Sequence, residues 1–250
     1  MTTVGLNGIA GQMGQTIVET ADERDDVSVT FGIDVAHVDA NVPVYDPDET
    51  ATALTEQEPD VVIDFTVPGA TAELARSCAE AGVGLVVGTT GLGTDEFDTL
   101  EEASQSVPVL KATNFSRGIQ ALLRSLGPAL EALEGYDVEV LETHHNRKRD
   151  APSGTAKTVL ETIGEHREFD TVAGREGIQP REDGEVGMLV RRAGDVRGEH
   201  EVVIAGNDEV LSLTHRAEDR AVFAAGALDA AVWVTDQSPG RYDFGDVLDG

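Results

Sequence analysis

The sequence predicts an α/β protein in which a doubly wound parallel sheet is followed by a second, α+β domain with a mostly antiparallel or mixed open sheet. Three observations predict this fold. The chain begins with a strand, a glycine turn and a helix. Apolar strands without strict alternation, each followed by helical spacing, recur through the first half, as in parallel sheets covered on both faces. Strands of the second half alternate apolar and polar residues, which is typical of antiparallel sheets with one open face.

In the first half, strand and helix patterns alternate along the chain. Residues 2–23 contain a strand, a turn with Gly8, Gly11 and Gly14, and a helix, and residues 27–34 form a second strand. The segment 35–58 is expected to be a loop. An apolar strand followed by helical spacing then recurs twice, and a last apolar strand closes this half (residues 59–82, 83–106 and 107–118). This order of elements favours a Rossmann-like sheet over other topologies.

The character of the chain changes near Gly118. A helix leads to an alternating strand, a second helix and three closely spaced strands (residues 119–133, 136–145, 151–166, 185–194, 198–208 and 209–217). Residues 219–236 form a strongly apolar helix that we expect to return to the first domain. The expected domains are therefore 1–115 for the parallel sheet, 116–214 for the second sheet, and 215–250 for the returning helix and tail.

The chain is strongly acidic. It holds 47 Asp and Glu against 18 Lys and Arg, for a net charge of −29, and its lysines are only Lys111, Lys148 and Lys157. A very salty cytosol favours such a surface because screening removes its self-repulsion, whereas solubility alone would need less charge. Nucleic acid is excluded as a partner because binding it requires a basic face.

The sequence also predicts the compartment. No apolar run is long enough to span a membrane, and the N-terminus lacks a signal-peptide pattern, so we expect a cytoplasmic protein without a membrane partner. The single cysteine, Cys78, excludes an intrachain disulfide. It lies in a helical pattern, where a small buried side chain is the expected role.

Gly8, Gly11 and Gly14 fall where the first strand turns into the first helix. A dinucleotide site needs glycines at such a turn, because the backbone must approach the pyrophosphate closely and the helix must begin beside it. Asp34 closes the second strand 20 positions after Gly14 (34 − 14), where a carboxylate accepts hydrogen bonds from the adenosine ribose. The alternative is that Asp34 is one more surface acid. The spacing favours a dinucleotide site in residues 1–115.

The residue after Asp34 bears on the choice of cofactor. Val35 stands where a protein that binds the 2′-phosphate of NADPH usually offers an arginine. The Asp34 carboxylate would also repel that phosphate. We therefore predict that NADH is preferred over NADPH.

Two further runs directly follow apolar strands: GTTG at Gly88–Gly91 and ATNFS at Ala112–Ser116. In a doubly wound sheet the ligand crevice lies at the carboxyl ends of the strands. Their small hydroxyl and amide side chains suit the nicotinamide and its ribose. Taken alone, each run is explained equally well as an ordinary turn.

Positive charge concentrates in one segment, ETHHNRKRDAPSGTA, at residues 142–156. Lys148 lies between two arginines, and Ser153 is the predicted N-cap of the following helix. A cation beside the backbone amides of Gly154 and Thr155 suits a carboxylate ligand. The alternative is a solvated basic loop followed by a capped helix.

Two adjacent histidines precede this charge. His144 and His145 supply hydrogen-bond donors or a general acid. Neighbouring side chains on a strand point to opposite faces, so the pair does not easily chelate one ion. No third ligand stands at a recognisable metal spacing, so we predict no metal site.

The segment His144–Thr155 resembles the signature of the dihydrodipicolinate reductase family, which has two histidines, a lysine three positions after the second, and a DAPSGT turn. The central signature is highly specific, whereas the glycine turn and GTTG are not. The resemblance runs the whole chain and includes Gly8–Gly14, Gly88–Gly91, Asn114–Ser116, Arg192–Val202, Leu213–Arg220 and the closing FGDVLDG at residues 244–250.

The resemblance implies a two-domain enzyme of lysine (diaminopimelate) biosynthesis. Such an enzyme passes a hydride from NADH or NADPH to a cyclic dicarboxylate, with loss of water. His144 is implied as proton donor or acceptor and Lys148 as proton donor. The implied substrate contacts are His145, Ser153, Gly154 and Thr155. The implied cofactor shell is Gly8, Ile9, Ala10, Gly11, Gln12, Met13, Asp34, Gly88, Thr89, Thr90, Ala112, Thr113, Asn114 and Phe115.

The resemblance also implies a homotetramer assembled through the second sheet, which agrees with the alternating strands. Two positions depart from the family. Gln12 and Val35 stand where many members have arginine, and both departures weaken NADPH binding more than catalysis.

Two other functions stay open on the residues alone. The first is another nicotinamide-dependent oxidoreductase on the same architecture, against which the APSGT turn beside the histidines and Lys148 argues. The second is a non-catalytic dinucleotide-binding sensor, which would have no use for a proton donor. An activity test separates the sensor from the enzymes, and a panel of substrates separates the enzymes from each other.

Overall fold

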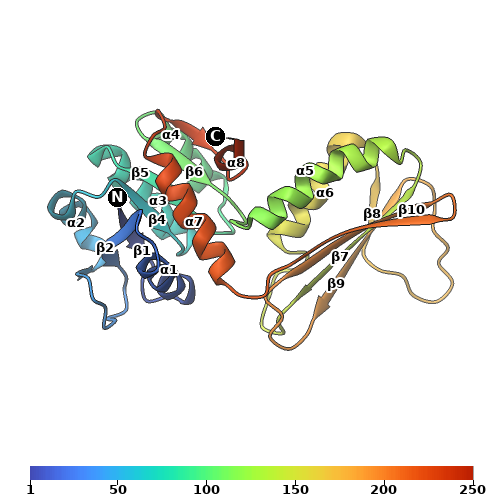
Figure 1. The fold of residues 1–250 in the computed structure, drawn as a ribbon, viewed down its shortest axis with the longest axis horizontal. Coiled ribbons are helices and arrows are strands. Elements are labelled where there is room, and N and C mark those ends of the chain that lie inside the picture. The colour runs from blue at the N-terminus through green and yellow to red at the C-terminus, as the bar shows by residue number, and fades with distance from the viewer. Residues whose placement is uncertain (250) are drawn as a thin grey trace. The chain divides into compact units, whose positions relative to one another are not determined.

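The computed structural model describes residues 1–249 and divides into two units (Figure 1). The first unit comprises Met1–Ser116 together with the segment that begins at Arg220, and the second is Arg117–Asp219. The last residue of the FGDVLDG stretch, residue 250, lies outside the described residues.

The first unit is built on one parallel sheet. Its strand order is β12-β6-β5-β4-β1-β2-β3. The strands are β1 (Thr2–Asn7), β2 (Val27–Ile33), β3 (Val44–Tyr45), β4 (Val61–Asp64), β5 (Gly84–Val87), β6 (Pro108–Lys111) and β12 (Gly240–Tyr242). All neighbouring strands run parallel. The order reverses direction between β1 and β4, which confirms the predicted doubly wound sheet and places its ligand crevice at that point.

Helices cover both faces of this sheet. They are α1 (Gln12–Asp22), α2 (Thr50–Gln57), α3 (Pro68–Ala81), α4 (Thr94–Ser104), α7 (Ala221–Val234) and α8 (Asp246–Asp249). Helices α1 and α7 bury one apolar core, and α2, α3 and α4 bury the other. Strands β4 and β5 are buried at every position because both of their faces are covered. This explains why these strands show no alternation in the sequence.

The expected loop at 35–58 is wrong in part. It contains β3, a 3₁₀ turn at Pro47–Glu49 and helix α2. The strand has only two residues, and α2 buries only Ala53 and Leu54. Elements this short carry too few apolar positions for a period to show. For the same reason the three-residue strands β8 (Asp170–Val172) and β12 were not predicted.

The second unit is a five-stranded sheet with two helices. Its strand order is β11-β10-β7-β9-β8. The remaining elements are α5 (Arg117–Ala132), β7 (Asp137–His144), α6 (Gly154–His166), β9 (Glu185–Arg192), β10 (Glu199–Gly206) and β11 (Glu209–Arg216). The β10–β11 and β10–β7 pairs are antiparallel, and the β7–β9 and β8–β9 pairs are parallel. The sheet is therefore mixed, which is one of the two arrangements predicted for it.

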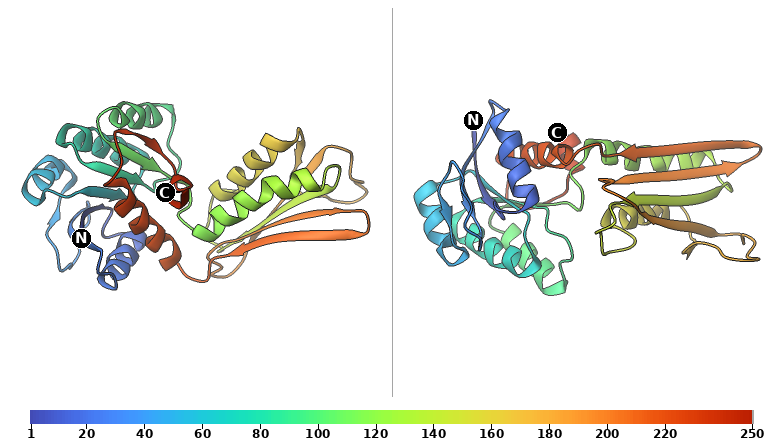
Figure 2. Two further views of the ribbon diagram at one scale, coloured as in Figure 1. Left: turned by 45° about the horizontal axis from the view of Figure 1, so that its top comes forward. Right: turned by 90° about the horizontal axis from the view of Figure 1, so that it is seen from below.

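Helices α5 and α6 lie side by side on one face of this sheet (Figure 2). They pack on inward-facing residues of β7 and β10, such as Val140 and Val202. Within the described part of the chain, no helix of this unit covers the other face. Leu189 is 40% exposed and Val210 is 67% exposed, and both belong by register to this open face.

Candidate active site

The glycine turn of the first unit is shaped by close backbone contacts. Gly8 has a φ of 88°, a left-handed conformation that favours glycine. A Cβ atom at Gly14 would lie 2.2 Å from the carbonyl oxygen of Gly8, so no side chain fits there. Helix α1 begins at Gln12, directly after the turn. The amides of its first turn therefore face the turn, as an anion such as pyrophosphate requires.

Asp34 lies beside this turn. Its Oδ2 accepts a hydrogen bond from the backbone amide of Ala10 at 2.9 Å, and its Oδ1 accepts one from Ala36 at 2.9 Å. The carboxylate thus links the end of β2 to the glycine turn. These residues line a cleft of about 490 Å³. Its lining includes Asp34, Gly8, Gly11 and the strongly exposed Val35.

A buried carboxylate, not predicted from the sequence, organises the neighbouring strand ends. Asp64, the last residue of β4, is fully buried. It accepts hydrogen bonds from Asn7 (2.8 Å), Thr66 (2.6 Å), Thr71 (2.5 Å) and Thr89 (2.8 Å). Burial raises its pKa. Thr89, which the sequence predicts in the cofactor shell, is therefore buried with its hydroxyl bonded to this carboxylate.

The other predicted cofactor residues follow the carboxyl ends of the parallel strands, but their side chains differ in access. The side chains of Ile9 and Phe115 belong to the buried core, so only their backbone faces the strand ends. Thr90 and Thr113 are exposed. Gly88 lies against Phe65, where a Cβ would come within 2.2 Å of the ring. Phe65, Thr66 and Val67 also line the cleft and were not predicted, although they directly follow an apolar strand.

In the second unit, the basic segment connects the end of β7 to the start of α6. His144 is the last residue of β7, and Ser153 caps α6 as predicted, accepting a hydrogen bond from the amide of Ala156 at 3.2 Å. Lys148 Nζ lies 2.8 Å from Asp150 Oδ1, and its side chain is 22% exposed. Helix α6 begins at Gly154. The structure therefore brings both histidines, Lys148 and this helix N-terminus into one connection.

The connection is closed by the segment after β9. The amide of Ala193 donates to the carbonyl of His144 at 2.9 Å, and that of Asn146 donates to Gly194 at 3.1 Å. Arg147 pairs with Asp195 at 2.9 Å on the surface. The stretches His144–Thr155 and Arg192–Val202, which both resemble the family, are thus in contact with each other.

A buried carboxylate lies behind His144. Glu142 has no exposed surface. Its Oε1 accepts hydrogen bonds from Arg192 Nη2 at 2.9 Å and from the amide of Ser153 at 3.1 Å. Its Oε2 lies 3.3 Å from Nδ1 of His144 and 3.7 Å from Nε2 of His200. The rings of the two histidines meet edge to face at 5.2 Å.

The ionisation of this cluster follows from its surroundings. Burial acts to raise the pKa of Glu142, but its polar contacts with His144, Ser153 and Arg192 outweigh this effect and lower the pKa to about 2. Burial, with the nearby charge of His144, lowers the pKa of His200 to about 4. At neutral pH the cluster therefore holds an ionised Glu142 and a neutral His200.

Glu142, His200 and Arg192 were not predicted as site residues. Glu142 precedes His144 by two positions on one strand, so the period of the strand already places both on the same face. His200 is different, because only the β10–β7 register pairs it with Glu142. One ligand atom from each of Glu142, His144 and His200 lies within 4.8 Å of the others, a proximity that sequence spacing does not reveal.

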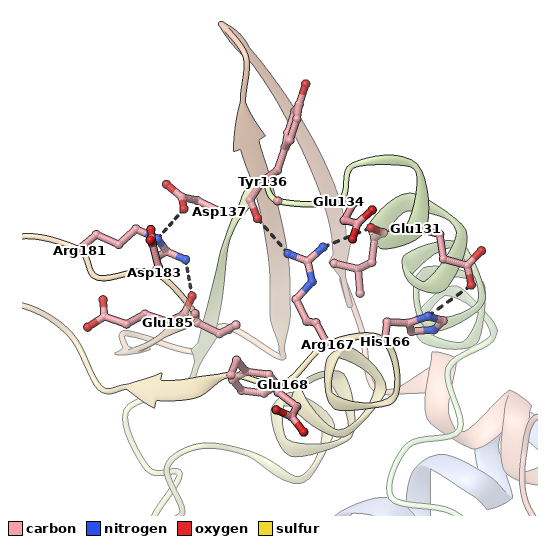
Figure 3. A pocket seen from close by; sticks show the side chains of 15 residues that line it. Glu131, Glu134, Tyr136, Asp137, His166, Arg167, Glu168, Arg181, Asp183 and Glu185 are labelled. Carbon is pink, nitrogen blue, oxygen red and sulfur yellow. Dashed lines mark hydrogen bonds and ion pairs between the residues drawn. The ribbon is translucent and has the colours of Figure 1, made fainter.

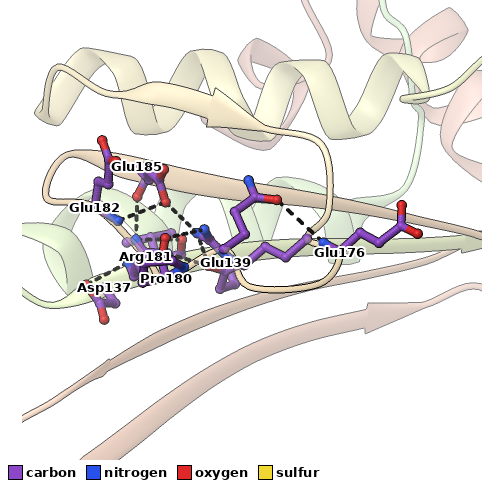
Figure 4. Close-up of polar contacts among 10 residues, drawn as sticks. Asp137, Glu139, Glu176, Pro180, Arg181, Glu182 and Glu185 are labelled. Carbon is purple, nitrogen blue, oxygen red and sulfur yellow. Dashed lines mark hydrogen bonds and ion pairs between the residues drawn. The ribbon is translucent and has the colours of Figure 1, made fainter.

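A second cavity, of about 550 Å³, lies where β7 begins, at the other end of this sheet (Figure 3). Its cations are engaged within the fold. Arg167 donates to the carbonyls of Tyr136 (2.9 Å) and Leu130 (3.2 Å). Arg181 forms ion pairs with Asp137, at 2.8 Å, and with Glu139. These ion pairs hold the loop that precedes β9 against β7 (Figure 4). These contacts indicate a structural role.

Models of one protein family match nearly the whole chain. The family model "Dihydrodipicolinate reductase, N-terminus" matches residues 2–115, and "Dihydrodipicolinate reductase, C-terminus" matches residues 118–248. A protein of Haloarcula marismortui named 4-hydroxy-tetrahydrodipicolinate reductase is 56% identical over 100% of both chains. One of the same name from Natronomonas pharaonis is 54% identical over 96% of this chain and 98% of its own.

The fold has a counterpart among solved structures. The dipicolinate-bound dihydrodipicolinate reductase from Paenisporosarcina sp. TG-14 superposes with a TM-score of 0.80 over 97% of both chains, at 22% identity. Among the described residues, none of the helices combines the length and apolar character that a membrane span requires. Two family models that together span nearly the whole chain, and relatives above 50% identity, show that the chain belongs to the dihydrodipicolinate reductase family.

Proposed function

We propose that the protein performs the family's reaction with the residues at the carboxyl ends of the parallel strands in the first unit and those of the His144–Thr155 connection in the second. The reaction is that of a 4-hydroxy-tetrahydrodipicolinate reductase in lysine (diaminopimelate) biosynthesis. A cyclic dicarboxylate takes up a hydride and a proton and loses water, giving tetrahydrodipicolinate. The proposal rests above all on the connection His144–Thr155, which joins two histidines, a lysine and a helix N-terminus.

The first unit is the cofactor-binding part. Its cleft fits a dinucleotide, because the glycine turn leaves no room for side chains and α1 begins beside it. NADH or NADPH supplies the hydride. We assign the pyrophosphate to the backbone of Gly8–Met13 and the adenosine ribose to Asp34. The nicotinamide end is assigned to the Gly88–Thr90 and Ala112–Phe115 segments.

The second unit holds the dicarboxylate and moves the proton. A protein of net charge −29 repels a dianion at long range, so a local cationic site is needed to bind it. We assign one carboxylate to the N-terminus of α6, at Ser153, Gly154 and Thr155, with His145 as a further contact. His144 and Lys148 are the proton-transfer residues. Dipicolinate in the Paenisporosarcina structure is a ligand of the same class.

The test is oxidation of NADH by the full-length protein in molar KCl. The substrate is generated in place from pyruvate and aspartate semialdehyde by the preceding synthase. We expect turnover that depends on both precursors. Folded protein that binds NADH but gives no turnover would overturn the proposal and leave a dinucleotide-binding protein with an anion site.

NADH is the proposed preferred cofactor, and we expect its kcat/KM to exceed that of NADPH about tenfold, which corresponds to about 1.4 kcal/mol. The reason is that the cleft offers the Asp34 carboxylate and the exposed Val35 where a 2′-phosphate needs a cation. Val35→Arg should raise kcat/KM for NADPH about tenfold and change that for NADH little.

The matched control for this prediction is His37→Arg, which adds the same charge two residues further along the exposed segment. Steady-state kinetics with both cofactors checks the three proteins. An equal gain in the two variants would mean that general attraction, and not a phosphate contact at position 35, is responsible. NADPH matching NADH in the unchanged protein would contradict the preference itself.

We further propose a homotetramer assembled through the open face of the second sheet. Leu189 and Val210 lie exposed on this face beside Leu141 and Val203, which is a poor arrangement for a surface facing water. In molar KCl, we expect sedimentation to give a particle with four times the mass of one chain. The Val210→Glu variant should sediment as smaller species that are still folded. A monomer at working concentration would contradict the assembly.

The acidic surface supports a halophilic enzyme. With 47 acidic residues against 18 basic ones, lowering the salt removes the screening that limits self-repulsion. The assay above, repeated across KCl concentrations, distinguishes salt-requiring from salt-tolerant catalysis.

A further inference from the structure

The buried carboxylate of Glu142 is held in one orientation by two other elements. Arg192, at the end of β9, and the amide of Ser153, before α6, both donate to Oε1. Arg192 also donates to the carbonyl of Asp150 at 2.6 Å, so its guanidinium is itself fixed. A buried carboxylate is retained only where such donors compensate its lost hydration. One oxygen is therefore used for anchoring, and the other, Oε2, is left toward the histidines.

Oε2 faces the inner nitrogen of His144. The Oε2–Nδ1 separation of 3.3 Å joins two groups with less than 15% exposure each. The opposite nitrogen, Nε2, lies beside Gly198, where a Cβ would be 3.2 Å away. Glycine at this position leaves the Nε2 edge uncovered on that side. Oε2 and Nδ1 are both buried and neither makes a hydrogen bond to any other group. Nε2 is therefore the ring nitrogen that can serve a ligand.

The titratable groups around this pair of atoms come from β9, β10, β11 and the connecting segment. His200 of β10 faces the same oxygen from 3.7 Å, but its Nε2 also lies 3.3 Å from Ser153 Oγ. Burial keeps His200 neutral at neutral pH. His215 of β11 pairs in register with His200, Arg192 of β9 pairs with His144, and Lys148 and Asp150 belong to the connecting segment. The ionised Glu142 is the carboxylate that contacts the His144 ring, at 3.3 Å.

We propose that Glu142 is a positioning residue for His144: its Oε2 accepts the Nδ1 proton and so keeps Nε2 for proton exchange with the substrate. The proton moves between Nε2 and the substrate, while Glu142 stays ionised throughout. This inference rests on the proposed function, because it gives Glu142 a part in that reaction.

A metal ion held by Glu142, His144 and His200 is the competing interpretation of the same proximity. The arrangement disfavours it. The guanidinium of Arg192 already pairs with the carboxylate at 2.9 Å, so a divalent ion would be placed close to a fixed positive charge. Metal content is therefore one of the outcomes of the test.

The experiment compares Glu142→Gln, Glu142→Asp and the control Glu161→Gln, which removes an exposed carboxylate from α6 of the same unit. In Glu142→Gln we expect kcat to fall about 10- to 100-fold with KM for the dicarboxylate within about threefold. The kcat–pH profile should be displaced from that of the unchanged protein, because the carboxylate that faces Nδ1 is gone. Glu142→Asp should restore part of that displacement, and Glu161→Gln should match the unchanged protein.

A second measurement keeps the inference testable if the variants fold poorly or the protein lacks reductase activity. ¹⁵N spectra of histidine-labelled, unchanged protein above pH 8 should show His144 as the Nδ1–H tautomer, which Glu142 would impose. The Nε2–H tautomer, a pH profile unaltered in Glu142→Gln, or stoichiometric metal with activity abolished by a chelator would each overturn it. Absence of turnover with the Nδ1–H tautomer present would count against the proposed function and leave the pairing intact.

Discussion

Lys148→Arg is expected to lower kcat about 100- to 1,000-fold while KM for the dicarboxylate stays within about threefold. Both side chains are cationic, so electrostatic attraction of a dianion is kept. The guanidinium does not release its proton in proteins, whereas an ammonium can act as a general acid. The loss therefore falls on proton transfer and spares binding.

The structure supports Lys148 for this role. Its ammonium lies 2.8 Å from Asp150, and its side chain is 22% exposed, in the segment that ends at the α6 N-terminus. Lys157, on the exposed face of α6, is the only other lysine of the second unit and provides the control. Lys157→Arg should leave kcat unchanged. An unchanged kcat in Lys148→Arg would remove Lys148 from the chemistry.

Gly14→Ala is expected to weaken NADH binding at least 100-fold and to lower the free energy of unfolding by about 3 kcal/mol. The added Cβ would lie 2.2 Å from the carbonyl oxygen of Gly8 and 2.7 Å from the Cα of Ile9. Both are backbone atoms, so no side-chain rotation relieves the contact. The turn must move, and with it the amides that we assign to the pyrophosphate.

Gly69→Ala is the matched control for this prediction. Gly69 lies in the first turn of α3, and a Cβ there meets nothing within 4 Å. Alanine at that site should stabilise the helix by up to about 1 kcal/mol. Calorimetric unfolding and titration with NADH check both variants. Tight NADH binding by Gly14→Ala would show that the turn does not carry the cofactor.

The regular elements of the first unit were predictable because their signals are local. The apolar run of β4, the apolar run of β5 and the glycine turn before α1 are each formed by residues that are close together in the sequence. The cap of α6 at Ser153 is local as well. Signals of this kind arise from backbone conformation and burial period, which depend little on distant parts of the chain. Short elements such as β3 and β12 lack such a period and escaped prediction.

The candidate site was predictable only in its contiguous part. The segment His144–Thr155 carries its own pattern, and the resemblance to a known family extended that pattern to the whole chain. Asp64, Arg192 and His200 carry no comparable pattern. Each is one polar residue in an acidic chain until its contacts are known.

By itself, then, the sequence determined the order of most strands and helices, apart from β3, α2, β8 and β12. It also determined the glycine turn, the acidic surface and the cationic segment with its capped helix. Only the tertiary structure decided that Glu142 is buried behind His144 and that Arg192 and His200 surround it. The reason is strand pairing. The register that places His200 beside Glu142 is set by burial of the whole sheet against α5 and α6, and no short stretch of residues encodes it.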